Sequence, residues 1–193
     1  MIHVESNQSL KANVQKIAQD LGFVECRIAP AVKAAHAEEY QTWVEKGMHG
    51  DMGWMERNID RRSDVRAVVP DAKAVICLAL NYYPGRSPRP EHESNPNYRI
   101  ARYSWNDDYH DLIEAKLDEF NMALEVFGGT QRYYVDTGPV LERDYANESG
   151  MGWNGKSAVQ LHKTYGPWLF LCEMITTLPL EPCLLYTSDA ADD

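Results

Sequence analysis

Helix-like and strand-like segments alternate along the 193 residues without an internal repeat. This alternation predicts an α/β (α+β) sandwich of two or three layers. Two further observations support that fold class. The hydrophobic content of 44% is enough for one sizeable core. The continuous apolar run AKAVICLALNYY, at residues 72–83, is typical of a strand that is buried on both faces.

The first part of the chain predicts two helices and a strand before that apolar run. Apolar residues at helical spacing predict a helix over residues 10–21 that stops at Gly22. FVECRIA, at residues 23–29, alternates and predicts a strand, and a second helix covers about residues 34–46. The segment MHGDMGWMERNIDRRSDVR, at residues 48–66, has no clear period. We expect it to form short helical turns around a cleft.

The second part of the chain begins with a polar loop at residues 84–97, which four prolines punctuate. YRIARYSW, at residues 98–105, predicts a short strand. A long amphipathic helix is predicted to start near Asp108 and to end at the glycine pair that begins with Gly128. The remaining pattern predicts a strand at 131–136, a helix at 140–149, an extended segment at 157–162 and a strong strand at 168–176.

Composition and charge narrow the function classes. The net charge of -10 argues against a broad basic surface that grips a polyanion, although a few arginines can still make a local contact. No apolar run approaches the roughly 20 residues that a bilayer span needs. The N-terminus lacks the pattern of a signal peptide. We therefore expect no membrane association and a cytoplasmic location.

The four cysteines do not form a metal-binding or redox motif, because no two of them have Cys-x-x-Cys spacing. Cys26, Cys77 and Cys172 each lie in an apolar run, which favours buried and inert thiols. The six histidines show no metal-ligand spacing. The residues of this chain therefore predict no metal site.

The last eleven residues, CLLYTSDAADD at 183–193, fit neither a helix period nor a continuing strand. They resemble the translation of a transposon-type sequencing adapter. We interpret residues 1–182 as the native domain and residues 183–193 as a non-native tail. A genuine disordered C-terminus is the alternative.

Asp136 is the first candidate functional residue, because it ends a predicted strand where ligand crevices of α/β sheets form. The alternative is that it only caps the following helix. A catalytic acid at this position needs a carboxyl that stays protonated near neutral pH. Burial against aromatic residues such as Tyr133, Tyr134 or Trp153 favours the neutral form.

Three other features near Asp136 allow both a functional and a structural interpretation. Arg143 suits a phosphate or a planar polar group, but with Glu142 it is also typical of a solvated helix face. The loop GMGWNGK offers backbone N–H groups and Lys156 to a ligand, although glycines also serve tight connections. HGDMGWMERN, at residues 49–58, suits either a flat ligand or the core.

Three segments together are more specific than any one of them. HGDMGWMERN, RYSWNDDYH and VDTGPVLERDYANESGMGWNGKS, in that order and spacing, resemble epoxyqueuosine reductase over residues 1–182. The resemblance implies an oxidoreductase of queuosine biosynthesis that reduces the epoxycyclopentane of epoxyqueuosine to a cyclopentene at the wobble position of tRNA. It also implies a cobalamin cofactor, two [4Fe-4S] clusters, tRNA as partner and a cobalamin domain that resembles the flavin nitroreductase fold.

The resemblance also implies roles for individual residues. Asp136 matches the proton donor, which also lies at the cofactor, and Arg143 matches an arginine that meets the modified nucleoside or its RNA. The other residues implied at the cobalamin are Arg57, Tyr103, Ser157 and Gln160. In this interpretation the electrons come through the cofactor, so one protonated carboxyl is sufficient.

One departure from the family pattern affects the expected activity. The cysteine-rich ferredoxin-like segment of the family is absent, and the four cysteines of this chain do not provide cluster ligands. We therefore expect a monomeric cobalamin domain that has no enzymatic activity by itself. The alternatives are a nitroreductase-like flavoprotein and a non-enzymatic module that carries or processes corrins.

Overall fold

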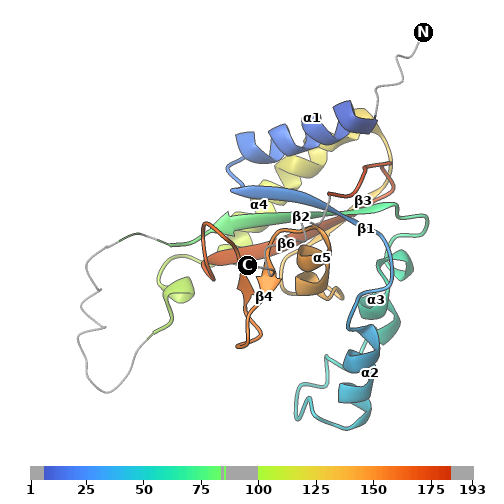
Figure 1. The fold of residues 1–193 in the computed structure, drawn as a ribbon, viewed down its shortest axis with the longest axis vertical. Coiled ribbons are helices and arrows are strands. Elements are labelled where there is room, and N and C mark those ends of the chain that lie inside the picture. The colour runs from blue at the N-terminus through green and yellow to red at the C-terminus, as the bar shows by residue number, and fades with distance from the viewer. Residues whose placement is uncertain (1–6, 84, 86–99, 184–193) are drawn as a thin grey trace, which may run out of the picture.

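The computed structural model describes residues 7–83, 85 and 100–183, and its centre is a four-stranded sheet (Figure 1). The strand order is β1-β2-β6-β3, and every neighbouring pair is antiparallel. The strands are β1 (Glu25–Pro30), β2 (Ala74–Asn81), β6 (Leu169–Thr176) and β3 (Gln131–Tyr134). Three of them lie within segments that the sequence predicts to be extended, and β1 overlaps the strand predicted at residues 23–29 and ends one residue later.

The central strands β2 and β6 carry the core on both of their faces. Residues 74–79 of β2 are all buried, as are residues 172–176 of β6. The prediction of a strand buried on both faces at residues 72–83 is therefore confirmed. Its neighbours are antiparallel, so the burial comes from helices on the two faces of the sheet and not from parallel pairing.

One face of the sheet is covered by α1 (Asn7–Asp20) and α4 (Tyr109–Leu124), as Figure 1 shows. Both helices match the predicted periodicity, and Asp108 caps α4 by accepting a hydrogen bond from the backbone N–H of His110 at 2.9 Å. The core on this face includes Ile76, Leu117 and Phe120, all fully buried. A short 3-10 turn, η4 (Glu125–Phe127), continues α4 toward Gly128.

The opposite face is covered by α5 (Glu142–Glu148) and by the segment around the 3-10 turn η1 (Val65–Ala67). The helices α2 (Ala37–Glu45) and α3 (Ile59–Ser63) form an arm that extends away from the sheet (Figure 1). A second buried cluster lies here, with Val65, Tyr145 and Ile175 among its members. The fold is therefore a sandwich of three layers. The fold-class prediction is confirmed in its mixed α/β character, and the short turns predicted within residues 48–66 are α3 and η1.

Two local predictions differ from the structure. The strand expected at 98–105 is wrong where the structure describes it, because η3 (Arg102–Ser104) is a 3-10 turn. Local hydrogen bonds favour this turn: the Ser104 hydroxyl donates to the carbonyl of Ala101 at 2.8 Å, and the Trp105 indole donates to that of Ile100 at 3.1 Å. The extended segment at 157–162 contains only β5 (Gln160–Leu161), which pairs with β4 (Trp153–Asn154) in a small hairpin.

Several sequence expectations concern residues outside the described ranges. The polar loop predicted at 84–97 lies outside them except for residue 85, and so do residues 184–193 of the predicted tail. Cys26, Cys77 and Cys172 are buried free thiols, as expected. Within the described ranges, no helix is both long enough and apolar enough to cross a membrane.

The β4–β5 hairpin generates a prediction about Gly152. A Cβ atom at this position would overlap the backbone carbonyl oxygen of Leu161, whereas one at Gly53 would meet nothing within 4 Å. We expect Gly152→Ala to destabilise the hairpin by about 1–3 kcal/mol. Gly53→Ala is the control. Hydrogen exchange of the Gly155 amide, which donates to the Val159 carbonyl at 2.9 Å, should accelerate only in Gly152→Ala. Equal protection in both variants would contradict this view of the hairpin.

Candidate functional site

Asp136 lies two residues beyond the end of β3, in the connection to α5, and has a left-handed backbone with φ of 52°. Its backbone N–H donates a hydrogen bond to Oε1 of Glu142 at 2.9 Å. The helix α5 begins after Leu141 and receives no side-chain cap there. The capping interpretation of Asp136 is therefore wrong, and its carboxyl is available for another role.

The carboxyl of Asp136 lies against the N-terminal turn of α4. Its side chain is 51% exposed, the Tyr109 hydroxyl donates a hydrogen bond to Oδ2, and Nε2 of His110 lies 3.8 Å from the same oxygen. Burial and the neighbouring Asp136 raise the pKa of Tyr109 above its ordinary value. Tyr109 is thus a neutral donor at physiological pH.

Stacking and capping hold these partners of Asp136 in place. The Tyr109 ring stacks on Phe170 and on His110, with centroid distances of 4.1 Å in both cases. The carboxylate of Asp108 accepts a hydrogen bond from the backbone N–H of His110 and lies 2.7 Å from Nδ1 of the same residue. These hydrogen bonds lower the pKa of Asp108. Tyr103 is half exposed, and its ring centroid lies 6.4 Å from that of Tyr109. The structure therefore brings Tyr103 to the same side of the molecule as Asp136.

Sequence reasoning missed two carboxyls behind Asp136. Glu142 is partly buried, and burial together with the charge of Asp136 raises its pKa to about 8. Glu173, on β6, is completely buried, and burial raises its pKa well above the ordinary value, with the nearby Glu142 as a second cause. The available signal was a single glutamate in the apolar run WLFLCEMI.

The β4–β5 hairpin contains or contacts three further predicted site residues. Gln160 is buried, and neither its amide oxygen nor its amide nitrogen has a hydrogen-bond partner among the described residues. Ser157 is exposed. Arg143 is also exposed, and its guanidinium donates to the carbonyl of Ala158, so it connects α5 with the hairpin. No contact between Arg143 and Asp136 is found among the described residues.

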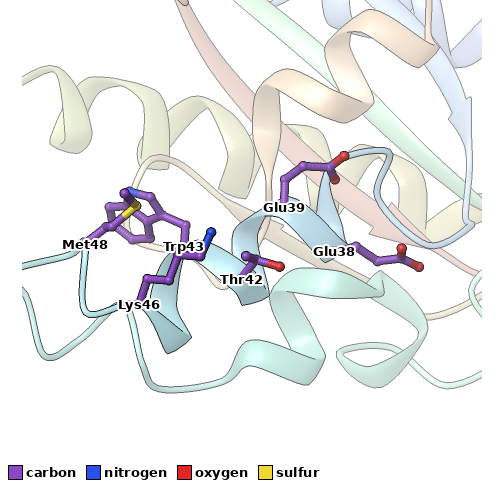
Figure 2. Close-up of a pocket in the computed structure, with 6 residues that line it drawn as sticks. All are labelled: Glu38, Glu39, Thr42, Trp43, Lys46 and Met48. Atoms are coloured by element: carbon purple, nitrogen blue, oxygen red, sulfur yellow. The ribbon is translucent and has the colours of Figure 1, made fainter.

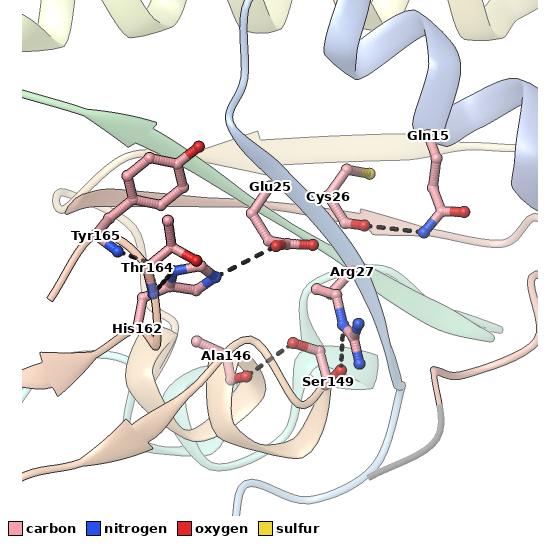
Figure 3. A network of polar contacts seen from close by, with 9 residues as sticks. All are labelled: Gln15, Glu25, Cys26, Arg27, Ala146, Ser149, His162, Thr164 and Tyr165. Carbon is pink, nitrogen blue, oxygen red and sulfur yellow. Dashed lines mark hydrogen bonds and ion pairs between the residues drawn. The ribbon is translucent and has the colours of Figure 1, made fainter. Parts of the chain in front are cut away.

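His162 fixes the end of this hairpin against β1 (Figure 3). Its Nδ1 accepts hydrogen bonds from the backbone N–H groups of Thr164 and Tyr165, at 3.1 and 3.2 Å. Its Nε2 therefore carries the proton and faces Oε2 of Glu25 at 3.3 Å. Below the same strand, Nε of Arg27 donates to the carbonyl of Ser149 at 3.0 Å, at the end of α5. The hairpin and α5 are thus both connected to the sheet.

Arg57 lies apart from these groups, exposed in the turns before α3. A residue close to it in sequence, Arg62, does reach the Asp136 loop, because its Nη1 donates to the carbonyl of Gly138 at 3.2 Å. Sequence reasoning did not single out Arg62. A shallow pocket of about 420 Å³ lies on α2, and none of the predicted site residues lines it (Figure 2). Within the described ranges, no group of three or more His, Cys, Asp or Glu side chains is arranged to hold a metal ion.

Comparison with known proteins identifies the class of this fold and site. Residues 62–137 match the family model described as epoxyqueuosine reductase QueG, DUF1730. The epoxyqueuosine reductase of Cyclobacterium marinum is 40% identical over 173 residues, which cover 86% of this chain and 54% of that protein. The enzyme of Synechocystis sp. is also 40% identical, over 75% of this chain and 49% of the relative.

Solved structures agree with these sequence matches. A crystal structure of epoxyqueuosine reductase with an epoxyqueuosine-modified tRNA-Tyr stem loop matches 93% of this chain and 48% of its own, with 26% identity and a TM-score of 0.80. The Streptococcus thermophilus enzyme also gives 26% identity and a TM-score of 0.80. The chain belongs to the epoxyqueuosine reductase family, and it spans about half the length of the curated relatives that it matches.

The raised pKa of Glu142 predicts a pH dependence of stability. Glu142 titrates at 4.5 when unfolded and at about 8 when folded, so its favourable contribution is complete below pH 4.5 and disappears as the pH rises to about 8. Glu142→Gln keeps the oxygen that accepts the Asp136 N–H and cannot ionise. We expect equal free energies of unfolding for the chain and the variant in acid, with the variant more stable at pH 8 by on the order of a few kcal/mol. Urea unfolding across this pH range measures the difference, and a constant difference would contradict the prediction.

Proposed function

We propose that this chain forms the cobalamin-binding and proton-donating part of an epoxyqueuosine reductase, which reduces epoxyqueuosine to queuosine at the wobble position of tRNA. The observation that carries the proposal is the half-exposed carboxyl of Asp136, held by the Tyr109 hydroxyl on a backbone that does not cap the next helix. The proposal is also supported by relatives named epoxyqueuosine reductase that match 75–86% of this chain.

In this proposal Asp136 delivers a proton to the oxygen that leaves the epoxide. Tyr109 donates to Oδ2 and His110 faces the same oxygen, so we assign the transferable proton to Oδ1. After the transfer, the hydrogen bond from Tyr109 stabilises the carboxylate that remains. Positioned proton donors of this kind contribute about 10²–10⁴-fold to the rate of a reaction.

The residues present are compatible with a corrin ligand. The amide of Gln160 has a donor and an acceptor that the described residues leave unpaired, and a corrin is rimmed with amides. Tyr103 offers an exposed ring beside Tyr109. We propose that these two residues, with Arg57 and Ser157, hold cobalamin in a domain whose fold resembles the flavin nitroreductases. When bound, the cofactor would supply the electrons for cleavage of the carbon–oxygen bond, with two [4Fe-4S] clusters as their source in the full-length enzyme.

We propose tRNA that carries epoxyqueuosine as the partner, with Arg143 as the residue that meets the nucleoside or its RNA. A relative of 26% identity has been solved with such a stem loop. In this chain the guanidinium of Arg143 is exposed and is held by the Ala158 carbonyl. This contact leaves donors of the guanidinium for an acceptor on the substrate.

The first prediction from this function concerns the cofactor. We expect the purified chain to bind cobalamin, seen as a change in its absorbance spectrum, and not to bind FMN. Gln160→Ala should weaken cobalamin binding by about 10-fold, because a buried polar partner of the ligand is lost. Glu119→Gln, on the exposed face of α4, is the matched control. Binding of FMN alone would overturn the proposal in favour of a flavoprotein.

The second prediction concerns Asp136 and needs a complete enzyme. We would use a chimera in which this chain replaces the matching segment of the Cyclobacterium marinum reductase. Asp136→Asn should leave cobalamin binding nearly unchanged and reduce turnover of an epoxyqueuosine-modified stem loop by at least ~10²-fold. Asparagine tolerates the left-handed backbone of this position, so the change isolates the acid. Unchanged turnover would remove Asp136 from the mechanism.

A further inference from the structure

Three carboxyls form a row that leads from the surface into the core. Asp136 is half exposed, Glu142 is partly buried and Glu173 is 0% exposed. The backbone N–H of Asp136 donates to Oε1 of Glu142 at 2.9 Å, which holds the Glu142 carboxyl beside the connection that carries Asp136. Glu142 opens α5, which covers the face of the sheet where Glu173 lies between its cross-strand neighbours Cys77 and Tyr134.

Glu173 forms no hydrogen bond of good geometry with a described residue. The charged groups that act on it are the carboxyls of Glu142 and Asp136. An unpaired ionised carboxylate is strongly unfavourable in this position because it is desolvated. Two adjoining carboxyls also avoid ionising together. Glu173 is therefore a neutral acid, and its contact with Glu142 is favourable only when a proton lies between them.

The groups that face this pair from the surrounding elements do not change that conclusion. Burial raises the pKa of the Cys77 and Cys172 thiols, so both are neutral. Tyr109 is neutral, and Nε2 of His110 lies 3.8 Å from Oδ2 of Asp136. The part of the chain that the structure describes offers no metal-holding group here. A purely structural position would be better filled by a glutamine or an apolar side chain, because neither carries the cost of ionisation.

The proposed reaction needs more protons than Asp136 carries. Removing the epoxide oxygen as water, with formation of the alkene, consumes two electrons and two protons. The electrons belong to the cofactor of the proposed function, and Asp136 supplies one proton. A second proton must reach the same oxygen in each turnover.

We propose that Glu142 and Glu173 store protons behind Asp136 and that Glu142 re-protonates Asp136 after it has donated to the leaving oxygen. In this step the O–H bond of Glu142 breaks and an O–H bond on Asp136 forms. Glu142 becomes a carboxylate, which accepts a hydrogen bond from the neutral carboxyl of Glu173. A proton from solvent later restores the pair. The inference rests on the proposed function, and both glutamates act through Asp136 and do not touch the substrate.

The first test reads the stored protons directly and does not depend on activity. The chain, labelled with ¹³C at its glutamate carboxyl carbons, is titrated by NMR, with Glu142→Gln and Glu173→Gln for assignment. We expect both carboxyls to be protonated at pH 7. Glu173→Leu should raise the titration midpoint of Glu142, since the hydrogen bond from Glu173 that favours the ionised form of Glu142 is lost. Glu119→Gln should leave both signals unchanged. Titration of either glutamate in the ordinary carboxyl range would overturn the proposal.

The second test, in the Cyclobacterium marinum chimera, separates the first proton transfer by Asp136 from the proton transfers that follow it. Glu142→Gln retains the acceptor for the Asp136 N–H but holds no transferable proton. We expect protonation of the leaving oxygen by Asp136 to persist and steady-state turnover to fall by about 10-fold, more steeply above pH 7. A structural defect would instead slow both phases equally at all pH values, and this result would overturn the relay. Failure of the unsubstituted chimera to bind cobalamin or to reduce the stem loop would overturn the proposed function, whatever the titration shows.

Discussion

The pairing of β2 with β6 is the constraint on which the rest of the structure depends. Eight residues of each strand are in register, from Ala74 opposite Thr176 to Asn81 opposite Leu169. Alternate side chains of the two strands enter the two cores, so α1 and α4 on one face and α5 on the other are all anchored to one ladder. A polar side chain in the middle of this ladder is buried with it. This is why Glu173, on β6, ends up as a neutral acid beneath the connection that carries Asp136.

The sequence predicts most of this framework because the framework follows from local periodicity. Within the run at residues 72–83, residues 74–80 are all apolar, and they lie in strand β2, which is buried over residues 74–79. The helix predicted after Asp108 has both an apolar stripe and a cap; α4 begins there and ends at Leu124, and η4 continues it toward Gly128. The short strand expected at 98–105 fails for a physical reason. A strand needs a partner, whereas the local hydrogen bonds of Ser104 and Trp105 satisfy a turn.

The site is harder to predict, because its members meet only through the sheet. Asp136 is found from its place after a strand, but its neighbour Glu173 is 37 residues away in sequence and is brought there by the β3–β6 pairing. Glu142 resembles a solvated helix residue, since nothing local shows that its side chain turns inward. Tyr109 and Arg62 are missed for the same reason. Long-range packing decides their roles, and a single sequence does not display it.

The segment that follows β6 has a consequence for self-association. β1 is an outer strand, and unpaired N–H and C=O groups on an outer strand are a template for another chain. Here the N–H of Cys183 donates to the carbonyl of Ile28 at 2.8 Å, and the N–H of Ile28 donates to Sγ of Cys183 at 3.3 Å. Cys183 thus occupies hydrogen-bonding groups in the middle of the outer edge of β1. Cys183 is the first residue of the tail that we interpret as non-native, so a native domain that ends at residue 182 would leave this edge of β1 open to another strand.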